Sequence, residues 1–551
     1  STRSNSKKPI NPQFMAPITV KINVFKKPSN KTRGNQKLLA IKNEYGYLGY
    51  SFIIPALLML AIYIALGHKP FGDFSVLTLD LNAQYVYFYE ALRDFVYGDT
   101  SLLYSFSRSL GGEFMGIYAY YIASPLSYIV ALFPKSMMLY ALLTIILIKV
   151  GLCGLSFGFY LHKQTKNINK TNVIMFSIMY ALSAYAITYQ NNIMWLDGLF
   201  LLPILTYSIE KLVKERKYLL FVGVLALMMM SHYYIGYMLC WYTFFCFFFT
   251  YFKEKDKNVI NTSGEKHHFI RSLMRIAGAS ALGIGISAFM VNAAYYSLQF
   301  GKKDFSEANW DLFSRFDLFD LFPKMLPGSY DTVMHEGLPL LYCGVLTLFM
   351  IPIYLMAKRV DSREKVFYSG FVLLYVLIMV INPTDLIMHG FQLPNCLNYR
   401  YSFMLCFFLL VLAYKGFGEI RKASTRFIGA IGAALIAFVA VAQKFEFSSY
   451  VERESSGIVE GQYLKELETV WLSVVAIIAI GAALCVATRA KRRTNVSVVL
   501  CILVCLEVFA NGLVCCVELG DDVIYSSYSS YNDYIGAFRP LADDILENDP
   551  S

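Results

Sequence analysis

The chain has 551 residues, of which 56% are hydrophobic, 16% aromatic and only 16% charged. This composition is too apolar for an ordinary soluble enzyme of that length and indicates a polytopic membrane protein. The formal charge of +10 does not call for a nucleic-acid partner, because Lys and Arg also anchor membrane helices and meet anionic lipid. We therefore expect membrane lipid, and no nucleic acid, among the partners.

Apolar runs close to the roughly 20 residues that a helix needs to cross a bilayer recur along the chain. They are apolar on all sides, which argues against the alternating strands of a membrane barrel and predicts an all-α protein. By length we predict about thirteen spans. They cover residues 47–66, 137–161, 171–189, 198–210, 218–231, 236–252, 272–298, 339–357, 366–381, 402–417, 427–442, 469–488 and 496–514.

The loops between these spans predict the orientation. Lys and Arg collect in alternate loops, such as "HKQTKNINK" (162–170) and "TRAKRRTN" (488–495), which is typical of cytoplasmic loops. The other set of loops is close to neutral or acidic and is predicted to face outward. It consists of residues 67–136, 190–197, 299–338, 382–401 and 443–468.

This pattern divides the chain into three parts. Residues 1–46 form a basic segment that we expect in the cytoplasm, and residues 47–514 form the transmembrane region. Residues 515–551 are polar and rich in Tyr, Ser and Asp. An odd number of spans places this tail outside, where we expect a disordered end or the start of an external region that continues past this chain.

The first external loop, residues 67–136, is far longer than a usual connection, which itself indicates a function. Asp80 lies in it, just before a stretch with helical periodicity. We expect this carboxylate at the mouth of a membrane-embedded cavity or, alternatively, as an N-cap that accepts amide hydrogen bonds. The predicted helix would lie in the membrane interface. Its apolar face consists of Tyr85, Tyr89, Leu92 and Val96.

The same loop contains a second apolar stretch, "IYAYYIASPLSYIVALFP" (117–134). Ser124 and Pro125 interrupt it, and Pro is incompatible with an unbroken helix. We interpret this stretch as a re-entrant or interfacial helical hairpin rather than a further span.

Several polar side chains lie in or beside the predicted spans. Lys149 is deep within its span, and an intramembrane ionisable residue indicates function by default, with a packed Lys bound to carbonyl groups as the alternative. Trp195 and Asp197 stand at an outer helix boundary, where a belt residue and a cap are the alternatives. His232 and Tyr233 occupy a tight outer turn, where a hydrogen-bonded helix end and a belt residue are the alternatives.

Arg400, in "LPNCLNYRYSF" (393–403), enters an outer span end beside Tyr399. An Arg on the outer side opposes the charge bias of the topology, and its guanidinium can hold a phosphate through two hydrogen bonds. A snorkelling anchor is the alternative.

Outward-facing aromatic residues, a lone carboxylate and an Arg together suit the handling of a lipid-linked phosphosugar. Asp80 would take the proton from an acceptor hydroxyl as general base. We expect Arg400, Lys149 and Arg108 to hold the donor phosphate as it departs. The residues expected to contact the substrate are Trp195, Asp197, His232, Tyr233 and Tyr399.

Several stretches between about residues 50 and 410 together resemble the YfhO family of bacterial membrane proteins. They include "LTLDLNAQYVYFYEALRDF", "SRSLGGEFMGIYAYYIASPLSYI", "NNIMWLDGLFLLPI", "SHYYIGYM", "GLPLLYCG" and "LPNCLNYRYSF". The resemblance implies a GT-C-like transmembrane helix bundle whose long first external loop contains interfacial helices. It also implies a glycosyltransferase that uses a polyprenyl-phosphate sugar. The essential carboxylate of such enzymes is matched here by Asp80, and the phosphate-binding role falls to Arg400.

The resemblance further implies a pathway in the bacterial cytoplasmic membrane, with the active site outside. A cytoplasmic-side polyprenyl-phosphate glycosyltransferase charges undecaprenyl phosphate, and a small flippase turns the product over. The family protein then moves the sugar to lipoteichoic or wall teichoic acid. We predict no cofactor and assign no metal ligand. The absence of a DxD pair near Asp80 agrees with a metal-independent reaction, and a divalent metal is left open.

Two other classes of function use the same residues differently. A transporter or flippase for a lipid-linked sugar or envelope polymer would use an aromatic, phosphate-binding cavity without a chemical step. An assembly scaffold for envelope enzymes would leave Asp80 as a cap and Arg400 as an anchor. We favour the transferase because we see no clear internal repeat of the kind common in transporters.

Overall fold

The computed structural model describes residues 43–105, 111–299, 308–334, 337–443, 467–489 and 493–548. The chain divides into a short unit, Ser1–Gly46, and a unit Tyr47–Ser551 that contains every helix named below. Within the described ranges, the only paired strands are the two-residue β1 (Tyr104–Ser105) and β2 (Gly112–Glu113).

The first group of long helices builds the centre of the larger unit. Helix α5 packs against α2, α6 and α8, while α9 packs against α12. These helices and the short ones between them are α2 (Leu48–Ala65), α5 (Met138–Gln164), α6 (Lys170–Ala181), α7 (Ala184–Thr188), α8 (Leu196–Glu215), α9 (Leu219–Ser231), α10 (Tyr233–Phe252), α11 (Lys257–Ile260) and α12 (His268–Gln299).

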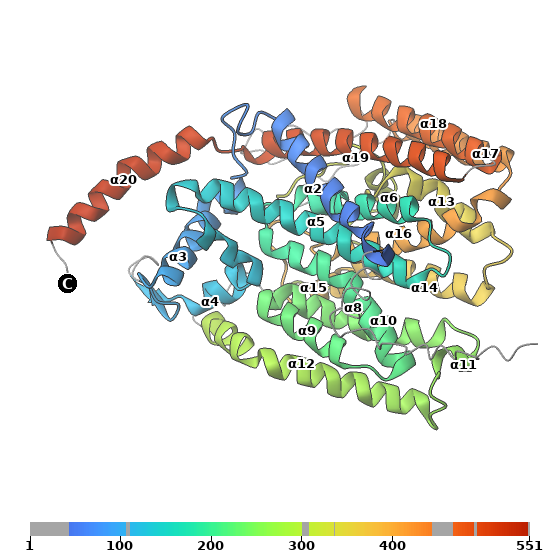
Figure 1. Ribbon diagram of the computed structural model, residues 1–551, viewed down its shortest axis with the longest axis horizontal. Coiled ribbons are helices and arrows are strands. Elements are labelled where there is room, and N and C mark those ends of the chain that lie inside the picture. Colours follow the sequence, from blue (N-terminus) through green and yellow to red (C-terminus); the bar gives the residue numbers. More distant parts are fainter. Residues whose placement is uncertain are drawn as a thin grey trace, which may run out of the picture. The chain divides into compact units, whose positions relative to one another are not determined.

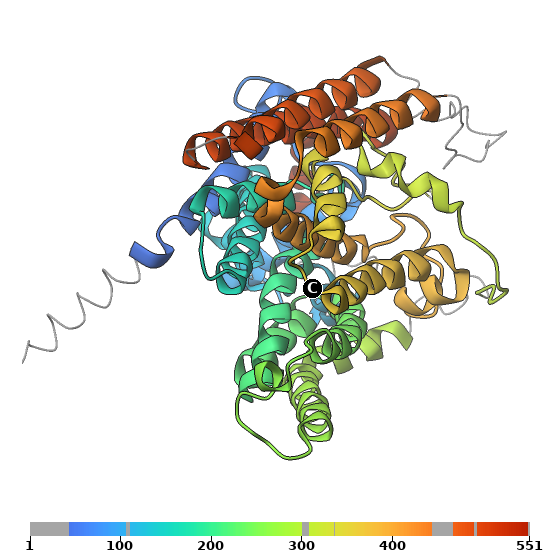
Figure 2. The ribbon, with the colours of Figure 1, turned by 90° about the vertical axis from the view of Figure 1, so that its right-hand side faces the viewer.

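A second group comes later in the chain, and its α16 packs against α13. Figure 1 and Figure 2 both place α18 and α19 side by side, in agreement with their contacts. The helices of this group are α13 (Val345–Met356), α14 (Ser362–Val380), α15 (Asn382–Met388), α16 (Ser402–Glu419), α17 (Thr425–Ala442), α18 (Leu467–Arg489), α19 (Arg493–Val523) and α20 (Tyr528–Asn548).

The prediction of an all-α polytopic membrane protein is confirmed. In the described ranges nine helices are long and apolar enough to cross a membrane, or ten if a bent pair counts as one span. About thirteen were predicted, and the difference arises because several apolar runs form shorter helices. The run at 171–189, for example, breaks at Leu182 and Ser183 into α6 and α7, while α9 and α13 are apolar but short.

Glycines let the central helices approach closely. Gly151, Gly154 and Gly158 lie along the face of α5 that meets α2, and a Cβ on Gly154 would come within 2.1 Å of the Ser51 carbonyl oxygen. In a bilayer, where lipid tails are as apolar as Leu, such close backbone packing holds helices together. The outer helices differ: α12 and α18 keep several large apolar side chains exposed, such as Phe289 and Val475, a surface suited to lipid.

The loop at residues 67–136, which the sequence predicts to be external, is largely helical. It contains a π-helical turn (Leu81–Tyr85), α3 (Val86–Tyr97), α4 (Met115–Ile117), a second π-helical turn (Tyr118–Ile122) and 3-10 segments at Pro125–Leu132 and Lys135–Met137. Three of the four predicted face residues, Tyr85, Tyr89 and Leu92, are buried, whereas Val96 is exposed in the last turn before α3 ends at Gly98.

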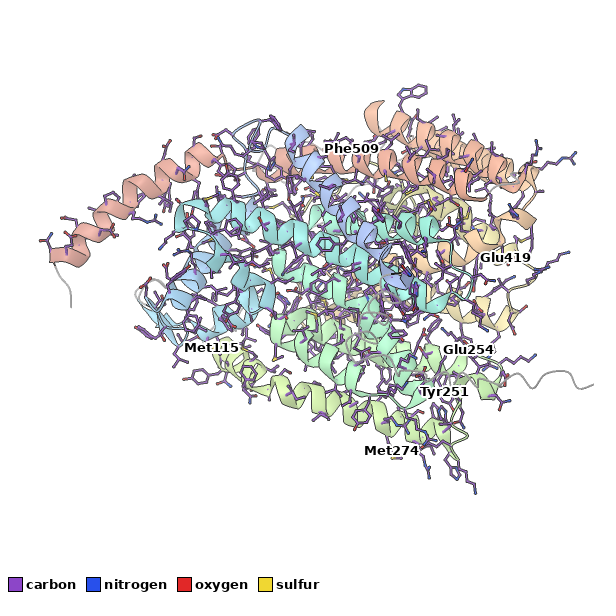
Figure 3. All side chains as sticks on the ribbon, viewed as in Figure 1. Met115, Tyr251, Glu254, Met274, Glu419 and Phe509 are labelled. Carbon is purple, nitrogen blue, oxygen red and sulfur yellow. The ribbon has the colours of Figure 1, made fainter. Side chains whose placement is uncertain are left out.

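The predicted hairpin is present. Met115–Ile122 and Pro125–Leu132 form an apolar pair bent by 95° at Ser124 and Pro125, which is the geometry of a broken span or a re-entrant loop. The hairpin contacts α12 through α4. Figure 3 shows Met115 of α4 at one end of the helices and Glu254 and Glu419, beside basic loops, at the other.

The tail differs from the expectation. Helix α19 continues past residue 514 to Val523, and α20 begins after a short connection. Tyr528 and Tyr531 are buried, so part of this polar segment packs against the rest of the unit. The start of an external region at residue 515 and the orientation of the chain stay predictions.

Candidate functional site

Asp80 stands at the start of the π-helical turn Leu81–Tyr85, but it does not cap it. Its backbone is already helical and its side chain makes no capping hydrogen bond, so the N-cap alternative is wrong. The half-buried carboxylate instead accepts hydrogen bonds from Gln84 Nε2 at 3.3 Å and from the Tyr85 hydroxyl at 3.1 Å. Both partners come from the turn that Asp80 begins, so the local fold aims the carboxylate.

Tyr85 connects this carboxylate to the turn between α7 and α8. Its single hydroxyl proton lies between two acceptors, with oxygen distances of 3.1 Å to Asp80 and 3.2 Å to Asn192 Oδ1. The backbone carbonyl of Asn192 in turn accepts from the backbone N–H of Trp195 at 2.8 Å. The segment "NNIMWLD" is thereby tied to the Asp80 turn.

A chain of aromatic rings continues from Tyr85 into the hairpin. The ring of Tyr85 is 4.9 Å from that of Tyr121, and Tyr121 is 4.6 Å from Tyr120. Tyr120 is 4.6 Å from the imidazole of His232 and 5.7 Å from Tyr233. We call these five rings, together with those of Trp195 and Tyr234, the Tyr120 cluster.

Arg400 contacts the Tyr120 cluster through two of its rings. The guanidinium carbon is 4.8 Å from the Trp195 ring and 5.4 Å from the Tyr234 ring, distances at which a cation is attracted to an aromatic face. Nε and Nη2 donate to the carbonyls of Leu397 and Cys396. Within the described ranges the guanidinium forms no ion pair with a carboxylate, so its charge is still available to an anion.

Two tyrosines of α7 and its end hold the backbone around Arg400. The Tyr185 hydroxyl donates to the Arg400 carbonyl at 2.8 Å, and the Tyr189 hydroxyl donates to the Asn398 carbonyl at 2.7 Å. Arg400 is therefore fixed by backbone contacts as well as by the rings it faces.

The Cys396 thiol is influenced electrostatically by both Arg400 and Asp80. Burial raises the pKa of the Cys396 thiol most, Arg400 lowers it and Asp80 raises it further. Both charges thus influence this thiol, although no ion pair joins them among the described residues. Asp80 and Arg400, 320 positions apart in the numbering, therefore both adjoin the Tyr120 cluster.

Lys149 and Asp197 are partners. The Lys149 ammonium lies 2.9 Å from the Asp197 carboxylate, and it also donates to the Ile193 carbonyl at 3.0 Å. Ser124 of the hairpin donates to the same carboxylate at 3.2 Å. Both ions are almost fully buried and neutralise each other.

Of the other predicted site residues, some lie in the Tyr120 cluster and others do not. His232 caps α10 by accepting the Ile235 N–H at its Nδ1, while its buried Nε2 has no partner in the described ranges. Tyr233 lies in the Tyr120 cluster. Tyr399 instead packs edge-on against Phe316 at 5.5 Å, beside the ion pair of Arg315 and Asp385. Arg108 lies outside the described residues.

Sequence reasoning missed Tyr120 and Asn192. Both stand in quoted stretches, "IYAYYI" and "NNIMWLD", but Tyr is common in a membrane-interface belt and Asn in turns. Only the fold brings them to Asp80 and Arg400. The signal that was present is the group of three Tyr at positions 118, 120 and 121 within the longest of the loops predicted to face outward.

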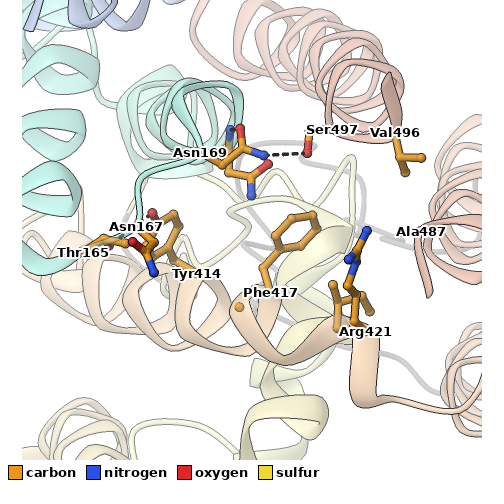
Figure 4. Close-up of a pocket in the computed structure, with 12 residues that line it drawn as sticks. Thr165, Asn167, Asn169, Tyr414, Phe417, Arg421, Ala487, Val496 and Ser497 are labelled. Atoms are coloured by element: carbon orange, nitrogen blue, oxygen red, sulfur yellow. Dashed lines mark hydrogen bonds between the residues drawn. The ribbon is translucent and has the colours of Figure 1, made fainter. Parts of the chain in front are cut away.

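Two pockets in the described ranges differ in their lining. An apolar pocket of about 430 Å³ lies between the hairpin, α9 and α12, and its lining includes Tyr118, Leu227 and Phe289. A polar pocket of about 270 Å³ lies beyond the C-terminal end of α5 (Figure 4), where Asn169 donates to Ser497 beside Arg421. Only the first adjoins the Tyr120 cluster, because Tyr118 and Tyr120 share one π-helical turn.

In the described ranges no group of three or more His, Cys, Asp or Glu side chains could hold a metal ion. The family model described as "Bacterial membrane protein YfhO" matches residues 51–550. No curated protein and no solved structure matches this chain.

Proposed function

The chain belongs to the YfhO family of bacterial membrane proteins, and from this premise we propose that it is a membrane glycosyltransferase of the GT-C class. The proposed donor is an undecaprenyl-phosphate sugar, and the proposed acceptor is a hydroxyl of lipoteichoic or wall teichoic acid. The reaction would take place on the outer face of the cytoplasmic membrane. A cytoplasmic-side enzyme and a small flippase would supply the donor.

The observation that carries this proposal is the convergence of Asp80 and Arg400 on the Tyr120 cluster. A carboxylate held by two donors of its own turn is placed to act as a base, and a guanidinium without a carboxylate partner in the described ranges is placed to receive a phosphate. The rings between them give the mixture of apolar faces and few polar groups that is typical of ligand sites.

In the proposed reaction Asp80 takes the proton of the acceptor hydroxyl. The acceptor oxygen forms a bond to the anomeric carbon, and the bond from that carbon to the phosphate oxygen breaks. The electron pair leaves with the polyprenyl phosphate, whose added negative charge is stabilised by Arg400. A fixed donor aimed at charge that develops during the reaction is worth far more in a dry site than in water.

The surrounding residues take supporting parts in this proposal. Trp195, His232 and Tyr233 line the sugar site as members of the Tyr120 cluster. The apolar pocket beside the hairpin suits the prenyl chain of the donor. Lys149, which the sequence assigned to the phosphate, is already neutralised by Asp197, so we propose that this pair supports the segment bearing Trp195.

Sugar transfer in proteoliposomes tests the proposal. Labelled undecaprenyl-phosphate sugar and purified teichoic acid are supplied to the wild type, Asp80→Asn and Asp99→Asn. Asp99 is the matched control, because it is an exposed carboxylate of the same loop. We expect Asp80→Asn to lower the transfer rate by about 10²- to 10⁴-fold at unchanged expression and membrane insertion, and Asp99→Asn to behave as wild type.

Two results would contradict the proposal. If Asp80→Asn transferred sugar at nearly the wild-type rate, Asp80 would not be the general base. If label crossed the bilayer equally with wild type and Asp80→Asn but never reached the polymer, the protein would be a flippase, the second function considered from the sequence.

A further inference from the structure

The connection between α19 and α20 pairs with the segment that leads to Asp80. The backbone N–H of Ser75 donates to the Ser526 carbonyl at 3.0 Å, and Ser526 N–H donates to the Leu77 carbonyl at 2.8 Å. Phe74 and Ser527 form an antiparallel bridge beside these hydrogen bonds. We call residues 523–531 the C-terminal clasp.

Thr78 joins the C-terminal clasp to the Asp80 turn. It is buried, and its hydroxyl lies 3.1 Å from the Val523 carbonyl and 3.2 Å from the Ile524 carbonyl. Its own carbonyl accepts the N–H of Leu81 at 3.1 Å and so closes the turn that contains Asp80. Thr78 therefore connects the end of α19 to the turn that contains Asp80, the proposed base.

The backbone on each side of this contact is strained. Leu79, directly before Asp80, has a φ of +49°, and Ile524 in the C-terminal clasp has a φ of +42°. For residues with a side chain this left-handed conformation is unfavourable, and it persists only where the surroundings impose it. Here the Thr78 contact and the backbone pairing surround the two residues. Leu79 directly precedes Asp80, so its conformation affects where the Asp80 side chain points.

A second attachment lies on the other side of Asp80. Tyr531 of the C-terminal clasp donates its hydroxyl to Glu90 of α3, and Arg539 of α20 lies 3.6 Å from the same carboxylate. Ser529 also donates to Asp73. The clasp thus holds the chain both before Asp80, at Asp73 and Thr78, and after it, at Glu90.

From these contacts we infer that the C-terminal clasp positions Asp80 for its reaction, with Thr78 as the positioning residue. The inference rests on the proposed function for the role of Asp80. The inference gives the C-terminal clasp a role in the active site. Sugar transfer would then depend on the pairing of the clasp with the segment before Asp80.

A cysteine pair tests the geometry without any activity measurement. Phe74 and Ser527 form a non-hydrogen-bonded antiparallel pair, in which Cα atoms lie about 4.5 Å apart, within the range of a disulfide. We expect Phe74→Cys/Ser527→Cys to cross-link on mild oxidation in membranes, and neither single variant to do so. Absence of the cross-link in the double variant would overturn the inference.

The matched pair Thr78→Val and Thr78→Ser tests the role of the hydroxyl. Valine keeps the shape and loses the hydrogen bonds, whereas serine keeps the hydroxyl. We expect Thr78→Val to lower kcat about 10- to 100-fold, the range for a misplaced reacting group, with the donor KM unchanged. We expect Thr78→Ser to retain wild-type kcat, and the oxidised cysteine pair to restore kcat in the Thr78→Val protein.

The outcomes separate the inference from the proposed function. Equal kcat in Thr78→Val and Thr78→Ser, or a loss that the cross-link does not restore, would overturn the positioning role while leaving a transferase. If the cysteine pair cross-links but the wild-type protein transfers no sugar, the proposed function is overturned instead.

Discussion

Lys149 and Asp197 form an ion pair of 2.9 Å in which the side chains are 0% and 1% exposed. The pair joins the middle of α5 to the first turn of α8, two residues after Trp195, whose ring faces Arg400. An ion pair at this depth compensates two charges that would each be very unfavourable alone. The pair therefore stabilises the packing of α5 against α8 and, through the start of α8, fixes the position of the Trp195 ring in the Tyr120 cluster.

The first prediction concerns this pair. We expect Lys149→Met or Asp197→Leu alone to destabilise the protein by about 3–5 kcal/mol, because each leaves a buried charge without its partner. The double variant should lose less than either single variant. Thermal unfolding in detergent, followed by Trp fluorescence, measures this. If Lys149→Met instead unfolds as wild type and only raises the donor KM, Lys149 is a phosphate ligand as the sequence suggested.

Arg400 gives the second prediction. A guanidinium can stack on Trp195 and Tyr234 and still present paired donors to a phosphate, whereas an ammonium cannot. We therefore expect Arg400→Lys to raise the KM for the lipid donor about tenfold, equivalent to one or two lost charge-assisted hydrogen bonds, with the acceptor KM unchanged. Arg363→Lys, in an exposed first turn of α14, is the control. Equal rises in both KM values would contradict a donor-specific role.

The Tyr85 hydroxyl gives the third prediction. It is shared by Asp80 and Asn192, so Tyr85→Phe removes one restraint on the base. A hydrogen bond contributes about 0.5–1.5 kcal/mol, so kcat for transfer should fall by roughly 2- to 13-fold. Tyr97→Phe serves as control, since the Tyr97 hydroxyl donates to Ala131 on the exposed side of α3. A rate for Tyr85→Phe that matches the control would exclude this contact from the reaction.

Local properties of the sequence predicted much of this fold. Apolar runs locate most helices because the bilayer selects length and apolarity, and Ser124 with Pro125 predicts the 95° bend of the hairpin. The limits of helices were harder to predict. Helix α19 continues to Val523 because polar residues sustain a helix beyond the apolar run that defines a span.

The arrangement of the site was only partly predictable for a different reason. Asp80 and Arg400 stand out by residue type and position, but contacts join residues far apart in the chain. Lys149 meets Asp197 across 48 positions, and Thr78 meets Val523 across 445. A single sequence does not indicate which buried charges meet, so Lys149 and Asp197 were given separate roles and the tail was expected to remain unpacked.

The last prediction concerns the pH dependence of the C-terminal clasp. His68 is buried between Tyr63, Phe74 and Tyr525 of the clasp, and burial lowers its pKa from 6.5 to about 4. The docked form therefore holds a neutral imidazole, whereas a released segment would let His68 take a proton near pH 6.5. Because the released form binds more protons, docking is undisturbed above pH 6.5 and weakens as the pH falls toward 4.

Spin labels at two exposed positions, residue 71 in the segment before Asp80 and residue 530 in the clasp, measure this by their distance distribution. We expect a single short distance at pH 7.5 and a long-distance fraction that grows as the pH falls from 6.5 to about 4, the interval between the two pKa values of His68. Asp73 does not titrate in this window, because its hydrogen bond to Ser529 lowers its pKa below 3.8. His68→Phe keeps an aromatic ring that cannot be charged, so its distances should not change with pH. The same pH dependence in that variant would show that another group controls docking.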